Sequence, residues 1–288
     1  MEKTYKNTTY YKPKKVALTT LFILSFTFFY TAKAFAVPPA DVGSPYSYNF
    51  NQGGVLHEVN LPDNSTSPYW WVSSGGNLNI YEGRGRTIKG ELQDDDPWRL
   101  IYAISNPRDT DNGYHPQNIF RLITRSIWQD AREEANFVIT KNNLSESPYR
   151  NQSNGLLLMN RYIDENNLYY TGIRVDGAAI IKKKQNGRYY TLAYIKGVYP
   201  GLYDRDTNPN LLPLNKWIGI RTEITNEGNN AVRIKVFIDK LWSGNWQLIA
   251  EAVDDGRTYG PAIRTGGFGG IRTDFMDVDF ENFRFRNL

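Results

Sequence analysis

The sequence predicts an all-β fold made of antiparallel strands, arranged as a sandwich or a barrel. Three observations predict it. Short apolar runs recur along most of the chain, turn-forming residues separate them, and no long run shows the 3.6-residue apolar spacing of an amphipathic helix. Many short strands at regular intervals are typical of antiparallel sandwiches and barrels.

The stretch 154–194 gives the clearest prediction of strand order. Asp-Glu-Asn-Asn, Asp-Gly and Gln-Asn-Gly interrupt it, and Asp-Gly or Asn-Gly between apolar runs favours a tight hairpin because both central residues need a positive φ. We therefore predict four successive antiparallel strands. The expected strands are Leu156–Tyr162, Leu168–Val175, Ala178–Lys182 and Tyr189–Tyr194. Lys182, Lys183 and Lys184 are interpreted as the charged end of a hairpin.

The chain before this stretch is less regular. Strands are expected at Tyr46–Phe50, Tyr69–Val72 and Leu78–Tyr81. The segment 93–117 is rich in Asp, Asn, Gly and Pro, and we predict a long surface loop that holds one strand at Trp98–Ile104. Loops of this length are usually functional or mobile. A helical turn is expected only at Asp130–Ala135.

The remaining strands follow from alternation of apolar and polar residues. In the run 118–128, Arg121 and Arg125 share one face and Phe120 the other. The segment 197–212 is rich in turn residues and is predicted to be a loop. Further strands are predicted at Asn136–Lys141, Trp217–Ile224, Ala231–Ile238, Trp246–Val253, Gly266–Arg272 and Asp277–Phe285.

The first 36 residues have the pattern of a secretory signal peptide. Lysines precede the apolar run Val16–Tyr30, and Ala34-Phe35-Ala36 supplies a cleavage site. A retained membrane anchor is the alternative. We expect residues 37–288 to form one domain, in which residues 37–68 are a leading loop and first strand. The expected location is the periplasm or medium of a bacterium, because an exported chain without cysteine fits that setting.

Charge and composition exclude several function classes. The leader holds six lysines and one glutamate, so its removal from a chain with 34 basic and 30 acidic residues leaves 28 and 29. This balance predicts neither nucleic-acid binding nor membrane insertion after cleavage. The absence of cysteine excludes disulfides, cysteine nucleophiles and thiolate metal sites.

The C-terminal part of the chain resembles a known superfamily. A strand led by Trp217, the run VRIKVFID at 232–239, the step GGIR at 269–272 and the closing VDFENFRF at 278–285 carry the resemblance. Over roughly residues 118–288 they are similar to the concanavalin A-like lectin and glucanase superfamily, which includes laminin-G-like domains. The resemblance implies a jelly-roll sandwich of two curved antiparallel sheets, with a concave face that commonly binds saccharide.

Alternating arginines and aromatic residues predict where such a ligand would bind. If their strands share a sheet, they would form one face suited to an acidic polysaccharide, because arginine pairs with carboxylates and aromatic rings offer flat apolar area. A solvated outer sheet is the alternative. The predicted binding residues are Arg121, Arg125, Tyr170, Arg174, Trp217, Arg221 and Glu223.

The closing strand carries acids at alternate positions. Asp277, Asp279 and Glu281 resemble the E-x-D-x-E pattern of glycosidases in this superfamily. Members of the superfamily often hold a structural Ca²⁺ near the last strand, so the resemblance also implies Asp277 and Asp279 as calcium ligands.

The predicted function is exported carbohydrate binding. One alternative is a polysaccharide-cleaving enzyme: a lyase that uses Arg and Tyr, or a glycoside hydrolase that uses Glu223 or the 277–281 acids. A laminin-G-like adhesion domain is a further alternative. The sequence leaves the oligomeric state open.

Overall fold

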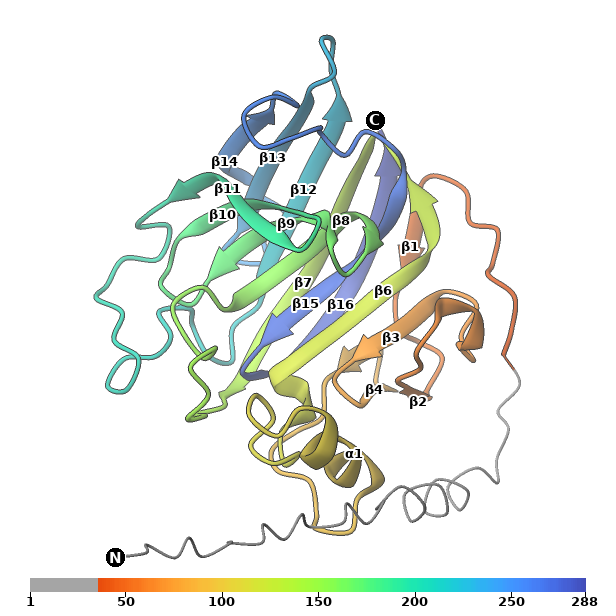
Figure 1. Cartoon of the computed structure of the whole chain (residues 1–288), viewed down its shortest axis with the longest axis vertical. Coiled ribbons are helices and arrows are strands. Elements are labelled where there is room, and N and C mark those ends of the chain that lie inside the picture. Colours follow the sequence, from red (N-terminus) through yellow and green to blue (C-terminus); the bar gives the residue numbers. More distant parts are fainter. Residues whose placement is uncertain (1–35) are drawn as a thin grey trace, which may run out of the picture. The chain divides into compact units, whose positions relative to one another are not determined.

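Two antiparallel sheets pack face to face in the computed structural model of the protein, which describes residues 36–288 (Figure 1). The predicted all-β sandwich is therefore confirmed. Residues 36–288 form one compact unit. The predicted signal peptide lies almost wholly outside the described residues. Within residues 36–288 no helix has the length and apolarity needed to cross a membrane.

The first sheet has nine strands. Their order is β14 (Gln247–Asp254), β13 (Val232–Asp239), β12 (Ile218–Asn226), β7 (Ala131–Asn142), β16 (Met276–Asn287), β5 (Arg84–Arg86), β4 (Asn77–Tyr81) and β2 (Gly54–His57), with β1 (Tyr46–Tyr48) also paired to β16. The second sheet has seven. Their order is β11 (Arg188–Ile195), β10 (Ala179–Gln185), β9 (Asn167–Arg174), β8 (Gly155–Asp164), β15 (Gly267–Asp274), β6 (Ile119–Trp128) and β3 (Trp70–Ser74).

The predicted four-strand meander is confirmed as β8 to β11, which are consecutive neighbours in the seven-stranded sheet. The expected pair of positive φ values is found in the Asn186-Gly187 turn, whereas in the Asp176-Gly177 turn only the glycine has a positive φ. Asn186 and Gly187 have φ values of 48° and 79°, and Gly177 has a φ of 74°. Local turn chemistry therefore sets the order and direction of these strands.

Alternation along each strand places the core between the sheets. Ile218, Ile220 and Ile224 of β12 point inward, as do Phe120 and Leu122 of β6. The core also contains polar contacts between the sheets, including those of Lys183 and Tyr169 with Asp254. The hydroxyls of Thr171 on β9 and Thr222 on β12 lie 2.6 Å apart and satisfy each other inside the sandwich.

The segment predicted to be a loop with a strand instead contains the helix α1, Pro97–Ser105. Asp96 is its N-cap, with a carboxylate oxygen that accepts hydrogen bonds from the backbone N–H of Trp98 at 2.7 Å and of Arg99 at 3.4 Å, and Pro97 occupies the first helical position. The predicted strand at Trp98–Ile104 is therefore wrong. The helical turn expected at Asp130–Ala135 is also wrong, because β7 begins at Ala131. Two short 3-10 helices occupy Pro62–Asn64 and Pro116–Asn118.

The three consecutive lysines of β10 do not form a uniformly charged hairpin end. Lys183 points into the interior and its side chain is fully buried against Asp254, at 2.9 Å. Because successive residues of a strand face opposite sides, Lys182 and Lys184 lie on the outer face. The interpretation of the lysine run as a solvated end is therefore wrong for its middle member.

Candidate functional site

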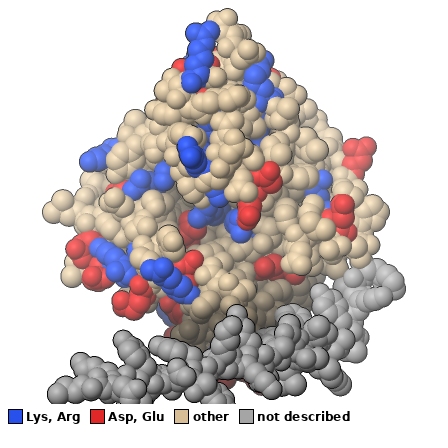
Figure 2. All heavy atoms as spheres, viewed as in Figure 1, with Lys and Arg blue, Asp and Glu red and all other residues tan. Residues whose placement is uncertain are grey.

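A cleft of about 390 Å³ lies on the outer face of the seven-stranded sheet. Leu157 of β8 and Ile180 of β10 line it, and the segment between β7 and β8 adds Tyr149, Asn151 and Ser153. Figure 2 looks onto this sheet from the same side as Figure 1 and shows Lys and Arg side chains over the middle of the face. The cleft is thus bounded by strands on one side and by an irregular segment on the other.

The face that carries the cleft is unusually apolar for the outer side of a sandwich. It has a hydrophobic cluster of its own, separate from the main core. The buried members of this outer cluster are Trp71, Ile123, Leu157, Met159, Tyr162, Leu168, Tyr170 and Ile180. An antiparallel sheet with one solvated face normally alternates apolar and polar residues. These apolar side chains are already buried within the described residues, with Val59 and Phe268 packed against them.

Gly172 leaves one position on this face of the sheet without a side chain. Its φ is 147°, and a Cβ there would lie 2.2 Å from the carbonyl oxygen of Leu156. Register places Gly172 opposite Leu157, which is opposite Arg272 on β15. A side chain at this position would therefore clash with the backbone of β8, which accounts for the glycine.

Arg272 is the main cation of the cleft. Its Nε lies 2.9 Å from a carboxylate oxygen of Asp274, and its guanidinium lies 5.0 Å from the ring centroid of Tyr170. Burial alone would lower the pKa of Arg272, but the negative charge of Asp274 outweighs it and the pKa is raised well above its ordinary value. The guanidinium is therefore charged, oriented by an acid and stacked on a ring.

Two tyrosines and two lysines extend the site. The rings of Tyr170 and Tyr189 stack with centroids 6.1 Å apart, and Tyr189 is 52% exposed, so a ligand can reach it. Burial would raise the pKa of Tyr189, but the charges of Arg272 and Lys184 outweigh it and lower that pKa. Burial raises the pKa of Tyr170, and burial together with Arg174 lowers the pKa of Lys182. The positive charges of the site thus lower the pKa of Tyr189 and add to the effect of burial on Lys182.

A second arginine lies directly across from the first. Arg121 on β6 is the register partner of Arg272 on β15. Like charges directly opposite each other in a sheet destabilise it. Asp274 compensates Arg272, whereas Arg121 has no ion pair with any residue in the range 36–288. This face therefore holds more positive than negative charge.

The structure divides the predicted binding residues between the two sheets. Arg121 and Tyr170 lie on the face that carries the cleft. Arg174 lies at the end of β9, where it donates to the Gln152 carbonyl at 3.0 Å and pairs with Asp176 at 2.8 Å. Arg125 is buried and donates to two backbone carbonyls, those of Val37 and Ser67 at 2.6 and 2.8 Å. Arg174 and Arg125 therefore act as anchors of neighbouring segments.

The other three predicted residues belong to the nine-stranded sheet. Arg221 on β12 pairs with Glu134 at 2.6 Å, and Glu223 pairs with Arg132 at 2.6 Å. Trp217 precedes β12 and stacks on Trp242 with ring centroids 5.8 Å apart. The expectation that all seven residues share one face is wrong, because β12 lies in the nine-stranded sheet.

The predicted calcium ligands, Asp277 and Asp279, contact nitrogen donors in the structure. Asp277 is buried and accepts hydrogen bonds from Gly90 N at 2.8 Å and from the side-chain amides of Gln117 and Asn143, both at 3.0 Å. Asp279 pairs with Arg86 at 3.3 Å and Lys89 at 2.5 Å. Nitrogen donors occupy both carboxylates, and residues 36–288 hold no group of three or more His, Cys, Asp or Glu that could bind a metal. These contacts brace the start of β16.

Sequence reasoning named Tyr170 but missed the other residues that line the cleft. Tyr189 and Lys182 were visible as members of the meander, and alternation places them on the face of Tyr170. Arg272 belongs to the GGIR step, which indicated the fold and gave no sign of a ligand site. Tyr149, Asn151 and Ser153 come from an irregular segment whose position no periodic pattern predicts.

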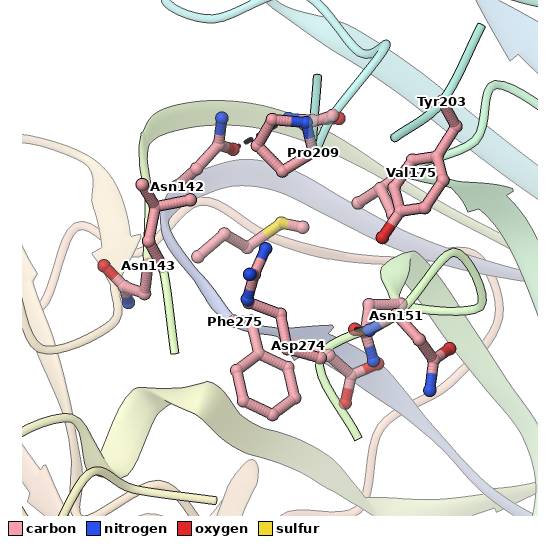
Figure 3. A pocket seen from close by; sticks show the side chains of 13 residues that line it. Asn142, Asn143, Asn151, Val175, Tyr203, Pro209, Asp274 and Phe275 are labelled. Atoms are coloured by element: carbon pink, nitrogen blue, oxygen red, sulfur yellow. Dashed lines mark hydrogen bonds between the residues drawn. The ribbon is translucent and has the colours of Figure 1, made fainter. Parts of the chain in front are cut away.

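A smaller crevice adjoins the cleft (Figure 3). Asn142, Asn143, Val175 and Tyr203 help to line it, and it shares Asp274 with the cleft. Its volume is about 20 Å³, which is room for little more than one water molecule. It is therefore too small to hold a ligand of its own.

No family model matches the chain, and no curated protein matches it. Solved structures similar to it include a carbohydrate-binding module from Bacillus subtilis, with 15% identity over 76% of this chain and 95% of that one and a TM-score of 0.46. A β-glucanase from Bacillus licheniformis has 12% identity, coverage of 85% and 99%, and a TM-score of 0.45.

A Bacillus subtilis protein of unknown function with a galectin-like fold has 12% identity, coverage of 82% and 97%, and a TM-score of 0.43. TM-scores this low carry no argument about what the chain binds. The resemblance to the concanavalin A-like superfamily is confirmed at the level of architecture, because the strand pairing gives two antiparallel sheets face to face.

Proposed function

We propose that the protein binds an acidic polysaccharide in the cleft of the seven-stranded sheet. One observation carries the proposal: two arginines, Arg272 and Arg121, lie directly opposite each other on the face with the stacked rings of Tyr170 and Tyr189, and Asp274 pairs with Arg272 alone. An anionic ligand would relieve the repulsion between the arginines. A planar guanidinium also binds a carboxylate through two parallel hydrogen bonds.

The neutral groups of the cleft favour a saccharide among possible anions. Tyrosine rings offer flat apolar area with a polar edge, which suits the C–H faces and hydroxyls of a sugar ring. Asn151, Ser153 and Asn154 add amide and hydroxyl groups that both donate and accept hydrogen bonds. The resemblance of the C-terminal part to saccharide-binding proteins supports the same ligand class.

The proposal is tested by titrating purified protein with acidic and neutral polysaccharides. Arg272→Lys keeps a positive charge beside Asp274 and removes the planar guanidinium group that lies over Tyr170. We expect about tenfold weaker binding of the acidic ligand, since a hydrogen bond to a charged group contributes about 1.5–3 kcal/mol. Arg233→Ala is the control, because Arg233 lies on β13 of the other sheet and pairs with Glu227 and Glu251 on the surface. Equal affinity of Arg272→Lys and wild type for every ligand would rule out the cleft.

A second candidate function is cleavage of a uronate polymer by β-elimination. Arg272 would neutralise the carboxylate, and the phenolate of Tyr189 would take the proton at C5. A C4–C5 double bond then forms, the C4–O bond breaks, and the leaving oxygen takes up a proton. The lowered pKa of Tyr189 favours this reading. Unsaturated, ultraviolet-absorbing product that disappears in Tyr189→Phe would establish it.

The hydrolase alternative has less support. Glu223 is held by Arg132, and Asp277 is buried under amide donors. Release of reducing ends without unsaturated product would nevertheless identify a hydrolase. Export remains part of the proposal, and N-terminal sequencing of protein from the periplasm or medium tests it: the mature chain is expected to begin at Val37.

A further inference from the structure

A groove of about 440 Å³ lies on the outer face of the nine-stranded sheet, opposite in the sandwich to the cleft. Strands β1, β16, β7 and β12 form its floor. Four arginines and one glutamate lie among its lining residues: Arg132, Arg221, Arg284, Arg286 and Glu134. We call this surface the arginine groove.

The arginines occupy two adjacent rows across the sheet. One row is Ser47, Arg284, Glu134 and Arg221, in register from β1 to β12. The other is Arg286, Arg132 and Glu223, from β16 to β12. With strands about 4.8 Å apart, the longer row spans about 14 Å. The side chains therefore form a continuous band across four strands.

The acids of the band do not balance its arginines. Glu134 lies between Arg221, at 2.6 Å, and Arg284, at 3.5 Å. Glu223 accepts two hydrogen bonds from Arg132, at 2.8 and 2.6 Å. Two carboxylates thus pair with three of the four guanidiniums.

The fourth guanidinium, that of Arg286, is the most informative. Arg286 is exposed, it forms no ion pair with the part of the chain that the structure describes, and it lies directly opposite Arg132. Arginines placed opposite each other repel. An outer sheet stabilised only by its own ion pairs would have an acid in one of these positions.

An aromatic surface continues the band at one edge. The guanidinium of Arg221 lies 4.0 Å from the ring centroid of Trp246, and the ring reaches over Gly219, where a Cβ would lie 2.8 Å from it. Trp217 and Trp242 stack beyond it, with Trp242 53% exposed. The combination of cations and flat rings is the same as in the cleft, although none of these residues is shared with it.

We infer that the arginine groove is a second binding site for acidic polysaccharide, in which Arg284 and Arg286 contact carboxylate or sulfate groups. The inference rests on the proposed function for the class of ligand. Since the two sites lie on opposite faces of the sandwich, one protein molecule can hold two polymer segments. The protein would then cross-link acidic polymers as well as bind them.

The test uses the full chain with polygalacturonate and dextran sulfate as acidic probes and dextran as the neutral probe. The groove variant is Arg284→Ala with Arg286→Ala, the cleft variant is Arg272→Lys, and Arg257→Ala is a control that removes an exposed arginine outside both sites. Thermal unfolding of each variant checks that it is folded.

Wild type and Arg257→Ala are expected to bind an acidic probe at two sites. At high polymer concentration they should cross-link the probe and make the solution turbid. The groove variant is expected to lose one of the two binding sites, or to bind the acidic probe at that site at least about tenfold more weakly. Its solutions should then stay clear. Dextran should not bind the groove. If the groove variant binds and cross-links like Arg257→Ala, the inference is overturned. If the cleft variant is unchanged while the groove variant loses binding, the cleft proposal fails and the groove stands.

Discussion

The buried lysine of β10 gives the most quantitative prediction. The ammonium of Lys183 is fully buried, lies 2.9 Å from Asp254, and donates hydrogen bonds to the carbonyls of Gly260 and Pro261 at 3.0 and 2.7 Å. Asp254 also accepts a hydrogen bond from Tyr169 at 2.6 Å. These contacts fasten β10 to the segment that follows β14. They also fix the register that turns Lys182 toward the cleft.

Lys183→Met is the informative perturbation, since methionine has a similar length and flexible packing but no charge. The change leaves the Asp254 carboxylate buried without its cation. Removing one partner of a buried ion pair costs about 3–5 kcal/mol. For a domain of this size that loss corresponds to a fall in Tm of roughly 6–20 °C. Equilibrium unfolding in urea measures the change directly.

The double variant Lys183→Met with Asp254→Asn is the matched control. It removes both charges, and well-packed neutral replacements of buried pairs are often close to neutral in stability. We expect it to be more stable than Lys183→Met alone. A single variant within about 1 kcal/mol of wild type would refute the reasoning, because no uncompensated charge would then be buried.

Three further predictions concern a buried acid, two titratable groups of the cleft and a strained glycine. Burial raises the pKa of Glu133 well above its ordinary 4.5, so the folded state binds an extra proton and stability falls as pH rises above that value. Thermal unfolding between mildly acidic and neutral pH should show that Glu133→Gln reduces this loss of stability. An unchanged pH profile in the variant would contradict the prediction. The pKa values of Lys182 and Tyr189 are both lowered, so raising the pH toward 10 removes a cation and adds an anion at the cleft. The affinity for an acidic polysaccharide should therefore fall in that pH range. The fall should be smaller in the double variant Lys182→Gln with Tyr189→Phe. Gly172→Ala should cost about 1–3 kcal/mol of unfolding free energy because of its φ of 147° and its contact with Leu156, and wild-type stability would show that the strand can shift.

Turn chemistry explains why the central strands were predictable. A type I′ turn requires a positive φ at both central residues, which Asn186-Gly187 adopts, and Gly177 supplies the single positive φ of the Asp-Gly turn, so these hairpins follow from local sequence. The helix α1 was missed because Asp94, Asp95, Asp96 and Pro97 were interpreted as loop residues. Asp96 and Pro97 are instead an N-cap and a first helical residue, which are equally typical of a helix start.

The candidate site was only partly predictable. Alternation of apolar and polar residues shows which face of a strand a side chain lies on, but it does not show which of the two sheets the strand joins. Alternation correctly places Arg221 outward on β12 and Tyr170 outward on β9. The chain crosses from one sheet to the other between β11 and β12, through an irregular segment with no periodic signal. Outward residues on these two strands therefore lie on opposite sides of the sandwich. Long-range pairing alone brings Arg272 beside Arg121.

One measurement tests the central claim most directly: the affinity of the protein for one polysaccharide before and after chemical reduction of its carboxyl groups. Both forms share length, linkage and ring hydroxyls, and they differ in that a neutral CH₂OH group replaces each carboxylate. If Arg272 and Arg121 hold a carboxylate, the reduced polymer should bind at least about tenfold more weakly. Equal affinity for the two forms would contradict the account.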